Sequence, residues 1–155
     1  AYKACAEFIK LAKQEMPNVV YLNVSFVGSN ALAQALGQDG EGVVVTQVVP
    51  HFASDTALVT EYRDRLKKYF PDSQPGFVSL EGYIAAKLLI KGLKNAKNGT
   101  TEALIDSIHQ ISNYDIGIGS RISFSEKQHQ ASGGVWPTVI KNGKLVSLEW
   151  SSLKR

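Results

Sequence analysis

The most apolar stretch of the chain runs from Val43 to Val49, where five of the seven residues are valine. Valine is stiff at χ1 and favoured on the pleated surface of a sheet. The stretch is apolar at successive positions, which is typical of a strand covered by helices on both faces. Gly42 precedes it, and Pro50 ends it because proline has no backbone N–H to donate. The pattern therefore predicts a central strand of an α/β sheet.

Apolar residues recur with helical spacing in several other segments, and polar residues occupy the opposite faces. The predicted helices are residues 1–15, residues 31–36, a segment with its apolar stripe between 58 and 70, residues 79–96, and a segment that follows residue 100. Side chains that cap helices precede three of them: Ser29 or Asn30, Ser54 or Asp55, and Thr100.

Shorter β-rich runs complete the pattern. They occupy residues 19–27, 121–125, 135–140 and 145–150. Asn142-Gly143 lies between the last two runs, and this dipeptide is the strongest short-range signal for a β-hairpin. The order helix, strand, helix, strand in the first 50 residues predicts parallel crossover units. The sequence thus has an α/β sector in residues 1–50, which the C-terminal hairpin completes. A helical sector, residues 55–112, lies between residue 50 and the hairpin.

Composition narrows the classes of partner. The net charge is +3, but the lysines are spread over helix faces, so we expect no nucleic-acid partner. The single cysteine, Cys5, excludes an internal disulfide, and no apolar run approaches the roughly 20 residues of a membrane span. No signal peptide is present, but the chain starts within a helical pattern without a cap. We therefore expect a mature or truncated piece of a protein.

Motifs that carry catalysis are missing from the sequence. It has neither a G-x-S-x-G nucleophile elbow nor a G-x-x-x-x-G-K-[ST] phosphate loop, and Gly117-Ile118-Gly119 is interpreted as a turn. The histidines, His51, His109 and His129, have no zinc-site spacing and no cysteine partner. We therefore predict a protein that is not an enzyme, with no catalytic residue, no metal and no cofactor.

An ordered series of segments resembles the periplasmic branched-chain amino-acid (leucine, isoleucine, valine) binding protein family. The segments are Asn23–Ser29, Leu36-Gly37, Gly42–Pro50, Leu80–Leu89, Asp115–Gly117, Ile122–Ser125, His129–Ser132 and Asn142–Lys144. They cover essentially the whole chain and follow the order of the family. Such proteins are type I solute receptors of ABC importers, with two α/β lobes joined by three crossover strands. The resemblance implies a periplasmic or extracellular location and a membrane permease as partner.

The resemblance also implies that this chain is the C-terminal portion of a two-lobed receptor with a Rossmann-like parallel sheet. Residues 1–50 would belong to the second lobe, 51–54 would be a hinge crossing, and 55–112 would be helices of the first lobe. Residues 113–155 would be a C-terminal segment whose hairpin returns to the second lobe. A lone part of such a receptor exposes apolar lobe faces, so we expect the fragment to self-associate.

The ligand of such a receptor lies in the cleft between the lobes, where helix N-termini favour a carboxylate. The corresponding residues here are Ser29 and Asn30, after a strand, and Phe77, Ser79 and Glu81, at the start of the longest helix. Each has an alternative role. Ser29 and Asn30 are also candidate helix caps, Phe77 a candidate core residue, and Glu81 a partner of the helix dipole.

The predicted function is capture of a small carboxylate-bearing ligand, either an amino acid or an organic or aromatic acid, for an ABC importer. The alternative from another class is a ligand-sensing domain of the same fold in a signalling receptor. An α/β enzyme domain is a third alternative, because a fold alone does not exclude catalysis.

Overall fold

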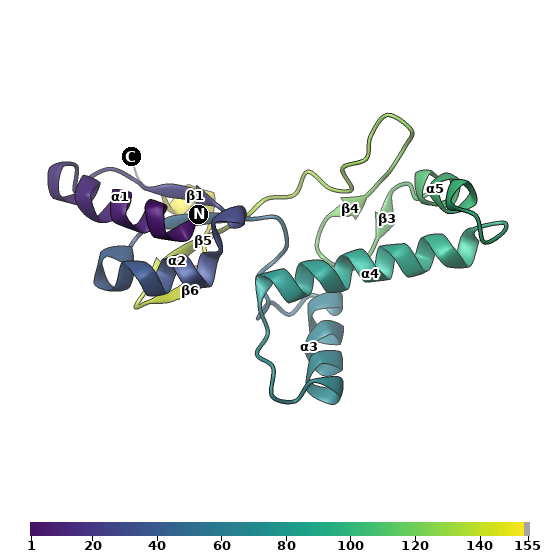
Figure 1. Cartoon of the computed structure of the whole chain (residues 1–155), viewed down its shortest axis with the longest axis horizontal. Helices are drawn as coiled ribbons and strands as arrows, with labels where there is room; N and C mark the ends of the chain where they lie inside the picture. The colour runs from purple at the N-terminus through teal and green to yellow at the C-terminus, as the bar shows by residue number, and fades with distance from the viewer. Residues whose placement is uncertain (154–155) are drawn as a thin grey trace. The chain divides into compact units, whose positions relative to one another are not determined.

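The computed structural model describes residues 1–153, which divide into two compact units (Figure 1). One unit comprises Ala1–His51 together with the chain from Val135 onwards, and the other comprises Phe52–Gly134. The chain therefore passes from one unit to the other twice. The assignment of these units to the two lobes of a receptor, with a hinge at residues 51–54, stays a prediction.

The first unit is built on a four-stranded sheet in the order β1-β2-β5-β6. The strands are β1 (Leu22–Val24), β2 (Val44–Gln47), β5 (Trp136–Lys141) and β6 (Lys144–Ser147). The predicted central strand is confirmed, because β2 lies inside the sheet with fully buried valines. It pairs with β1 in parallel and with β5 in antiparallel orientation, so the sheet is mixed. The predicted α/β class is confirmed.

The closing hairpin is present as predicted. Strands β5 and β6 pair in antiparallel orientation, and Lys141 faces Lys144 at the last position of the ladder. Asn142 and Gly143 between them have φ values of 51° and 72°. Two consecutive positive φ angles are what a type I′ turn requires, and Asn-Gly is the dipeptide that accepts them best.

Helices cover this sheet. They are α1 (Tyr2–Glu15) and α2 (Ser29–Leu36), with short 3-10 turns η1 (Ser25–Val27), η2 (Gly37–Gly40) and η3 (Trp150–Ser152). Helix α1 packs on α2 and α2 contacts β6, so the buried stripe of each helix joins one core. Lys13 of α1 donates hydrogen bonds to the carbonyls of Asp39 and Glu41, and these bonds connect the loop before β2 to α1.

The second unit consists mainly of helices (Figure 1). They are α3 (Ala57–Tyr69), α4 (Phe77–Asn95) and α5 (Thr101–His109), followed by the two-residue strands β3 (Tyr114–Asp115) and β4 (Arg121–Ile122). Its core includes Leu58, Val59, Leu80 and Ile84. Helices α4 and α5 cross at the buried Gly92. No helix among residues 1–153 is long and apolar enough to span a membrane.

Several predicted boundaries are wrong. The strand predicted for residues 19–27 is only Leu22–Val24, because the backbone turns into η1 at Ser25. Helix α4 begins at Phe77, two residues before the predicted start. The second hairpin strand, β6, ends at Ser147, before the end of the predicted run 145–150, and η3 begins at Trp150.

Two of the three predicted helix caps are also wrong. Helix α2 begins at Ser29, its N-cap is Gly28, and neither Ser29 nor Asn30 caps it with a side chain. The physical reason is that the hydroxyl of Ser29 is bonded to a buried side chain of β2 instead. The N-cap of α3 is Thr56, so Ser54 and Asp55 lie outside that helix.

The predicted cap at Thr100 is confirmed. Its hydroxyl oxygen accepts a hydrogen bond from the backbone N–H of Ala103 at 3.2 Å, and this satisfies one donor of the first turn of α5.

Candidate functional site

The turn from β1 into α2 carries the candidate residues of the first unit. Gly28 adopts a left-handed conformation with φ of 85°, and α2 begins at the next residue. The first N–H groups of a helix lack partners within the helix, and the helix dipole adds positive partial charge there. This turn therefore offers hydrogen-bond donors to an anion.

The two candidates in this turn have different environments. Ser29 is only 7% exposed, whereas Asn30 is exposed. Ser29 Oγ accepts a hydrogen bond of 2.9 Å from Nε2 of Gln47, at the end of β2. Asn30 therefore presents a neutral amide to solvent, while Ser29 is joined to the core.

Gln47 and Thr138 are residues of this region that the sequence analysis missed. Each is 1% exposed. Gln47 Nε2 also donates to Thr138 Oγ1 at 3.2 Å, and Thr138 Oγ1 donates to the carbonyl of Val45 at 2.7 Å. The one available signal was a glutamine inside the valine-rich run, because a buried polar side chain requires partners. Thr138 gave no signal, since threonine is common in strands.

The start of α4 carries the other three candidates. Phe77 is buried, and its ring meets that of Phe52 edge to face with centroids 4.9 Å apart. Ser79 Oγ lies 2.6 Å from the hydroxyl of Tyr62 on α3. Glu81 is exposed. The structure thus places Phe77 in a packed environment, ties Ser79 to the neighbouring helix, and leaves Glu81 at the surface of the second unit.

A charged cluster joins α3 to α4. Lys87 Nζ lies 2.6 Å from Oε2 of Glu61, and the hydroxyl of Tyr83 donates to Oε1 at 2.7 Å. The hydrogen bond from Lys87, followed by that from Tyr83, lowers the pKa of Glu61. Burial, followed by the bond to Glu61, raises the pKa of Tyr83 to about 12. The cluster borders a mainly apolar groove of about 900 Å³ between the two helices.

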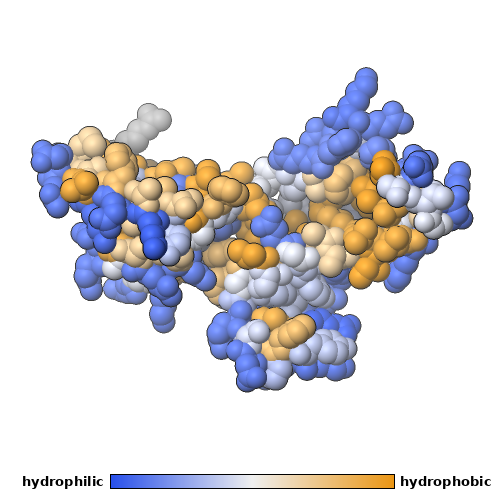
Figure 2. All heavy atoms as spheres, viewed as in Figure 1, coloured by the Kyte–Doolittle hydropathy of each residue, from blue (hydrophilic) through white to orange (hydrophobic). Residues whose placement is uncertain are grey.

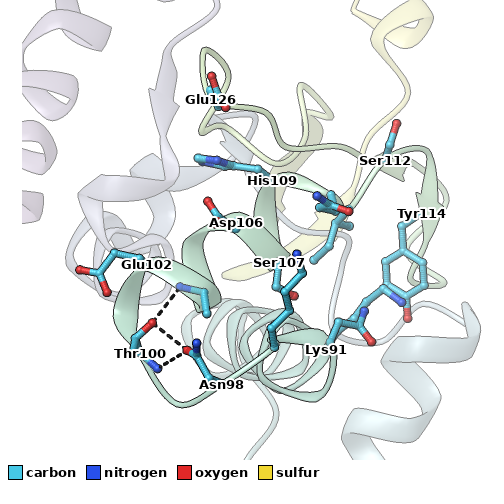
Figure 3. Close-up of a pocket in the computed structure, with 15 residues that line it drawn as sticks. Lys91, Asn98, Thr100, Glu102, Asp106, Ser107, His109, Ser112, Tyr114 and Glu126 are labelled. Atoms are coloured by element: carbon cyan, nitrogen blue, oxygen red, sulfur yellow. Dashed lines mark hydrogen bonds between the residues drawn. The ribbon is translucent and has the colours of Figure 1, made fainter.

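A second hollow of about 770 Å³ lies near α5 and is polar (Figure 3). Asn98 and Thr100 at its edge are hydrogen-bonded to each other, and Lys91 lies over the ring of Tyr114 at 4.2 Å. Part of its polar lining thus caps α5 and joins neighbouring segments. Within residues 1–153, no group of three or more histidine, cysteine, aspartate or glutamate side chains could hold a metal ion.

Three solved structures illustrate what the chain resembles. A "possible leucine/isoleucine/valine-binding protein" from Rhodopirellula baltica SH 1 is 40% identical, with a TM-score of 0.90 over 99% of this chain and 42% of that chain. A branched chain amino acid ABC transporter protein from Thermus thermophilus with bound valine is 19% identical, with a TM-score of 0.69 over 93% and 42%. A fatty acid ABC transporter substrate-binding protein from Thermomonospora curvata is also 19% identical, with a TM-score of 0.78 over 94% and 40%.

The sequence identity decides what each similarity shows. The two structures at 19% identity show the fold alone, which is the predicted type I fold. The chain spans about two fifths of the length of each of the three structures. No curated protein matches the chain.

The sequence profile of the family described as periplasmic binding protein matches residues 2–144, which is nearly the whole chain. This match agrees with the ordered motifs, with the mixed α/β fold and with the predicted periplasmic location. Together with the structural likeness, it shows that the chain belongs to the periplasmic binding protein family.

Proposed function

We propose that this chain is part of the solute-binding component of an ABC importer and that its ligand is a small molecule with a carboxylate. The names of the similar structures mention valine and other branched-chain amino acids in some cases and fatty acids in another. A carboxylate is the group that these ligands share. A membrane permease is the partner that this role requires, and the role involves no catalysis.

The observation that carries the proposal is the start of α2. The turn offers backbone N–H groups, the amide of Asn30 and the hydroxyl of Ser29, and these groups suit a carboxylate. No acidic side chain occurs between Gly28 and Leu36. A buried ammonium without a carboxylate partner loses hydration worth several kcal/mol, and a neutral amide restores only part of it. The turn therefore recognises the acid group and not an ammonium group.

The start of α4 supplies the second part of the proposal. Phe77, the first residue of the helix, is buried against Phe52, and Ser79 and Glu81 lie in the first turns. Glu81 is the acidic side chain that would accompany an ammonium group if the ligand is an amino acid. Aliphatic and aromatic acids without an ammonium group need no such partner.

Calorimetry on the full-length gene product tests this function. The panel contains leucine, isoleucine and valine together with their deaminated acids, and each acid has its methyl ester as a control. We expect an acid to bind and its ester to bind at least tenfold more weakly. Asn30→Ala should weaken binding about tenfold, whereas Gln34→Ala, one turn further along α2 and also exposed, should not. A panel in which no carboxylate binds refutes the function.

The panel also tests the role of Glu81. If valine binds tightly while 3-methylbutanoate does not, the ammonium group is recognised after all. Glu81→Gln should then abolish valine binding, and an unchanged affinity would exclude Glu81 from the site.

Self-association of this chain by itself belongs to the same proposal. Strand β1 is an edge of the sheet, and Leu22, Val24 and Phe26 expose 51%, 59% and 89% of their surface. Phe8 and Leu11 of α1 are exposed as well, and Figure 2 shows apolar residues over this part of the unit. An uncharged, apolar edge strand is a template for pairing with another strand. We expect two copies to pair through β1.

Light scattering during gel filtration tests the self-association. The wild-type chain should elute as a dimer or larger species, and Leu22→Lys should shift it towards the monomer because a charge on an edge strand opposes pairing. Thr60→Lys, at an exposed position of α3, is the control. A wild-type chain that stays monomeric over a hundredfold range of concentration contradicts this expectation.

A further inference from the structure

Three buried polar side chains form a continuous series of hydrogen bonds inside the first unit. Ser29 lies at the start of α2, Gln47 at the end of β2, and Thr138 on β5 opposite Val45. Their exposed fractions are 7%, 1% and 1%, and Val45 is fully buried. Because so little of these groups reaches solvent, the protein itself determines which atom of each pair donates and which accepts.

The donor and the acceptor of each pair are fixed because the series ends at a backbone carbonyl. The carbonyl oxygen of Val45 can only accept, so the hydroxyl of Thr138 donates to it, at 2.7 Å. A hydroxyl has one proton, and that proton is then used. Thr138 Oγ1 can only accept from its other neighbour, and the amide of Gln47 must turn its NH₂ group towards it, at 3.2 Å.

The same assignment extends to the turn. The second proton of the Gln47 NH₂ group points to Ser29 Oγ at 2.9 Å, so Ser29 accepts this bond. The proton of the Ser29 hydroxyl is then directed elsewhere. Within the protein it has Gln47 Oε1 at 3.4 Å, which lies beyond the 2.5–3.0 Å typical of an O–H···O bond. A hydroxyl in this state keeps its proton for an external oxygen, while the Gln47 amide already occupies one of its two acceptor positions.

We infer that Gln47 and Thr138 are positioning residues that make Ser29 a hydrogen-bond donor, and that they thereby select a ligand oxygen over a ligand ammonium at the α2 turn. The inference rests on the proposed function and explains how this turn distinguishes the two charges. Gln47 and Thr138 act on the ligand only through Ser29. Their effect is therefore on selectivity, which a role in packing alone would not change.

Gln47→Glu, made in the full-length gene product, is the variant that should remove the donor role of Ser29. A carboxylate keeps the shape of the amide but can only accept, so the Ser29 hydroxyl donates to it and has no proton for the ligand. The probes are 3-methylbutanoate and 3-methylbutylamine, which have the same branched five-carbon skeleton and opposite charges. We expect the ratio of their affinities to fall at least thirtyfold in favour of the amine.

Charge-free variants keep the test valid if a buried carboxylate prevents folding. Thr138→Val removes the group that orients the Gln47 amide, and Thr138→Ser retains it. The ratio should fall about fivefold or more in Thr138→Val and change less than twofold in Thr138→Ser. Circular dichroism should show that each variant is folded at the temperature of the calorimetry.

The outcomes separate the two proposals. A folded Thr138→Val protein that is less stable but has the wild-type ratio overturns the inference, because these residues then serve packing alone. If 3-methylbutanoate and the other carboxylates fail to bind the wild type, the proposed function is refuted and the inference falls with it.

Discussion

Gly92 lies where α4 crosses α5, and replacing it with alanine tests whether the helical unit is packed as the structure shows. A Cβ atom built at Gly92 would lie 2.8 Å from Cγ1 of Ile108 and 3.1 Å from Cδ1 of Leu104. The carbonyl of Gly92 also accepts a hydrogen bond of 2.7 Å from the buried hydroxyl of Ser107. The two helices therefore approach closely at a point where only glycine fits without movement.

Two opposing effects determine the result of Gly92→Ala. Alanine is better than glycine inside a helix by about 1 kcal/mol. Overpacking of a tightly packed core costs about 1–3 kcal/mol, and here the nearest atom, Cγ1 of Ile108, is not the flexible end of a side chain. We therefore expect a net loss of about 1 kcal/mol in the free energy of unfolding of the helical unit.

The same helix offers a matched control. Gly82 is exposed on α4, and a Cβ atom built there meets nothing within 4 Å. Gly82→Ala should therefore raise the free energy of unfolding by about 1 kcal/mol, because only the helix propensity changes. The two substitutions are chemically identical, so a difference of about 2 kcal/mol between them reports the contact at the crossing.

Urea unfolding followed by circular dichroism measures both variants. Adding Ile108→Ala removes the atom that the new methyl group would meet, so Gly92→Ala should be less destabilising in that background than in the wild type. This coupling is the sign that the two residues are in contact. If Gly92→Ala stabilises the protein as much as Gly82→Ala does, α4 and α5 do not cross at this point.

Three further predictions concern local stability and can be measured by the same unfolding assay. Lys87, followed by Tyr83, lowers the pKa of Glu61 below its ordinary value of 4.5. The stabilisation that this carboxylate gives the fold is therefore present above the pKa of the unfolded state and is lost as the pH falls through the pKa of the folded state. Glu61→Gln should flatten the pH dependence of the free energy of unfolding below about pH 4.5. Thr100→Ala should cost about 1 kcal/mol through the lost cap, and Thr100→Ser should restore most of it. Asn142→Ala should cost about 1 kcal/mol because of the positive φ, whereas Asn142→Gly should be nearly neutral; equal effects would contradict the turn geometry.

The parts of the fold that were predictable depend on neighbouring residues. The central strand followed from consecutive valines, the hairpin from Asn142-Gly143, and the helices from their periodicity. The order of the strands depends on pairs such as Val44 with Val139, which lie far apart in the sequence. No local pattern encodes such pairs, and only the resemblance to a known family supplied the architecture.

Local reasoning also explains the wrong cap predicted for α2. A serine or asparagine before an apolar run is the usual sign of an N-cap, and the sequence offered Ser29 and Asn30 in that position. The sign fails when a distant group competes for the hydroxyl, as Gln47 does for Ser29. Gln47 lies on β2, 18 residues further along the chain, so its competition for the Ser29 hydroxyl arises only when the fold brings β2 beside the turn.

The hydrogen bond between Gln47 and Ser29 also bears on the candidate site. Burying an amide costs about 1–3 kcal/mol for each group left without a partner, and an apolar side chain of the same size would fill the space next to Thr138 without that risk. The core therefore gains little stability from having glutamine at position 47. What this glutamine does provide is a fixed assignment of donors and acceptors, because its NH₂ group donates to both Thr138 and Ser29 while Thr138 donates to the carbonyl of Val45. We expect an apolar residue at position 47 to erase this assignment while leaving the fold intact.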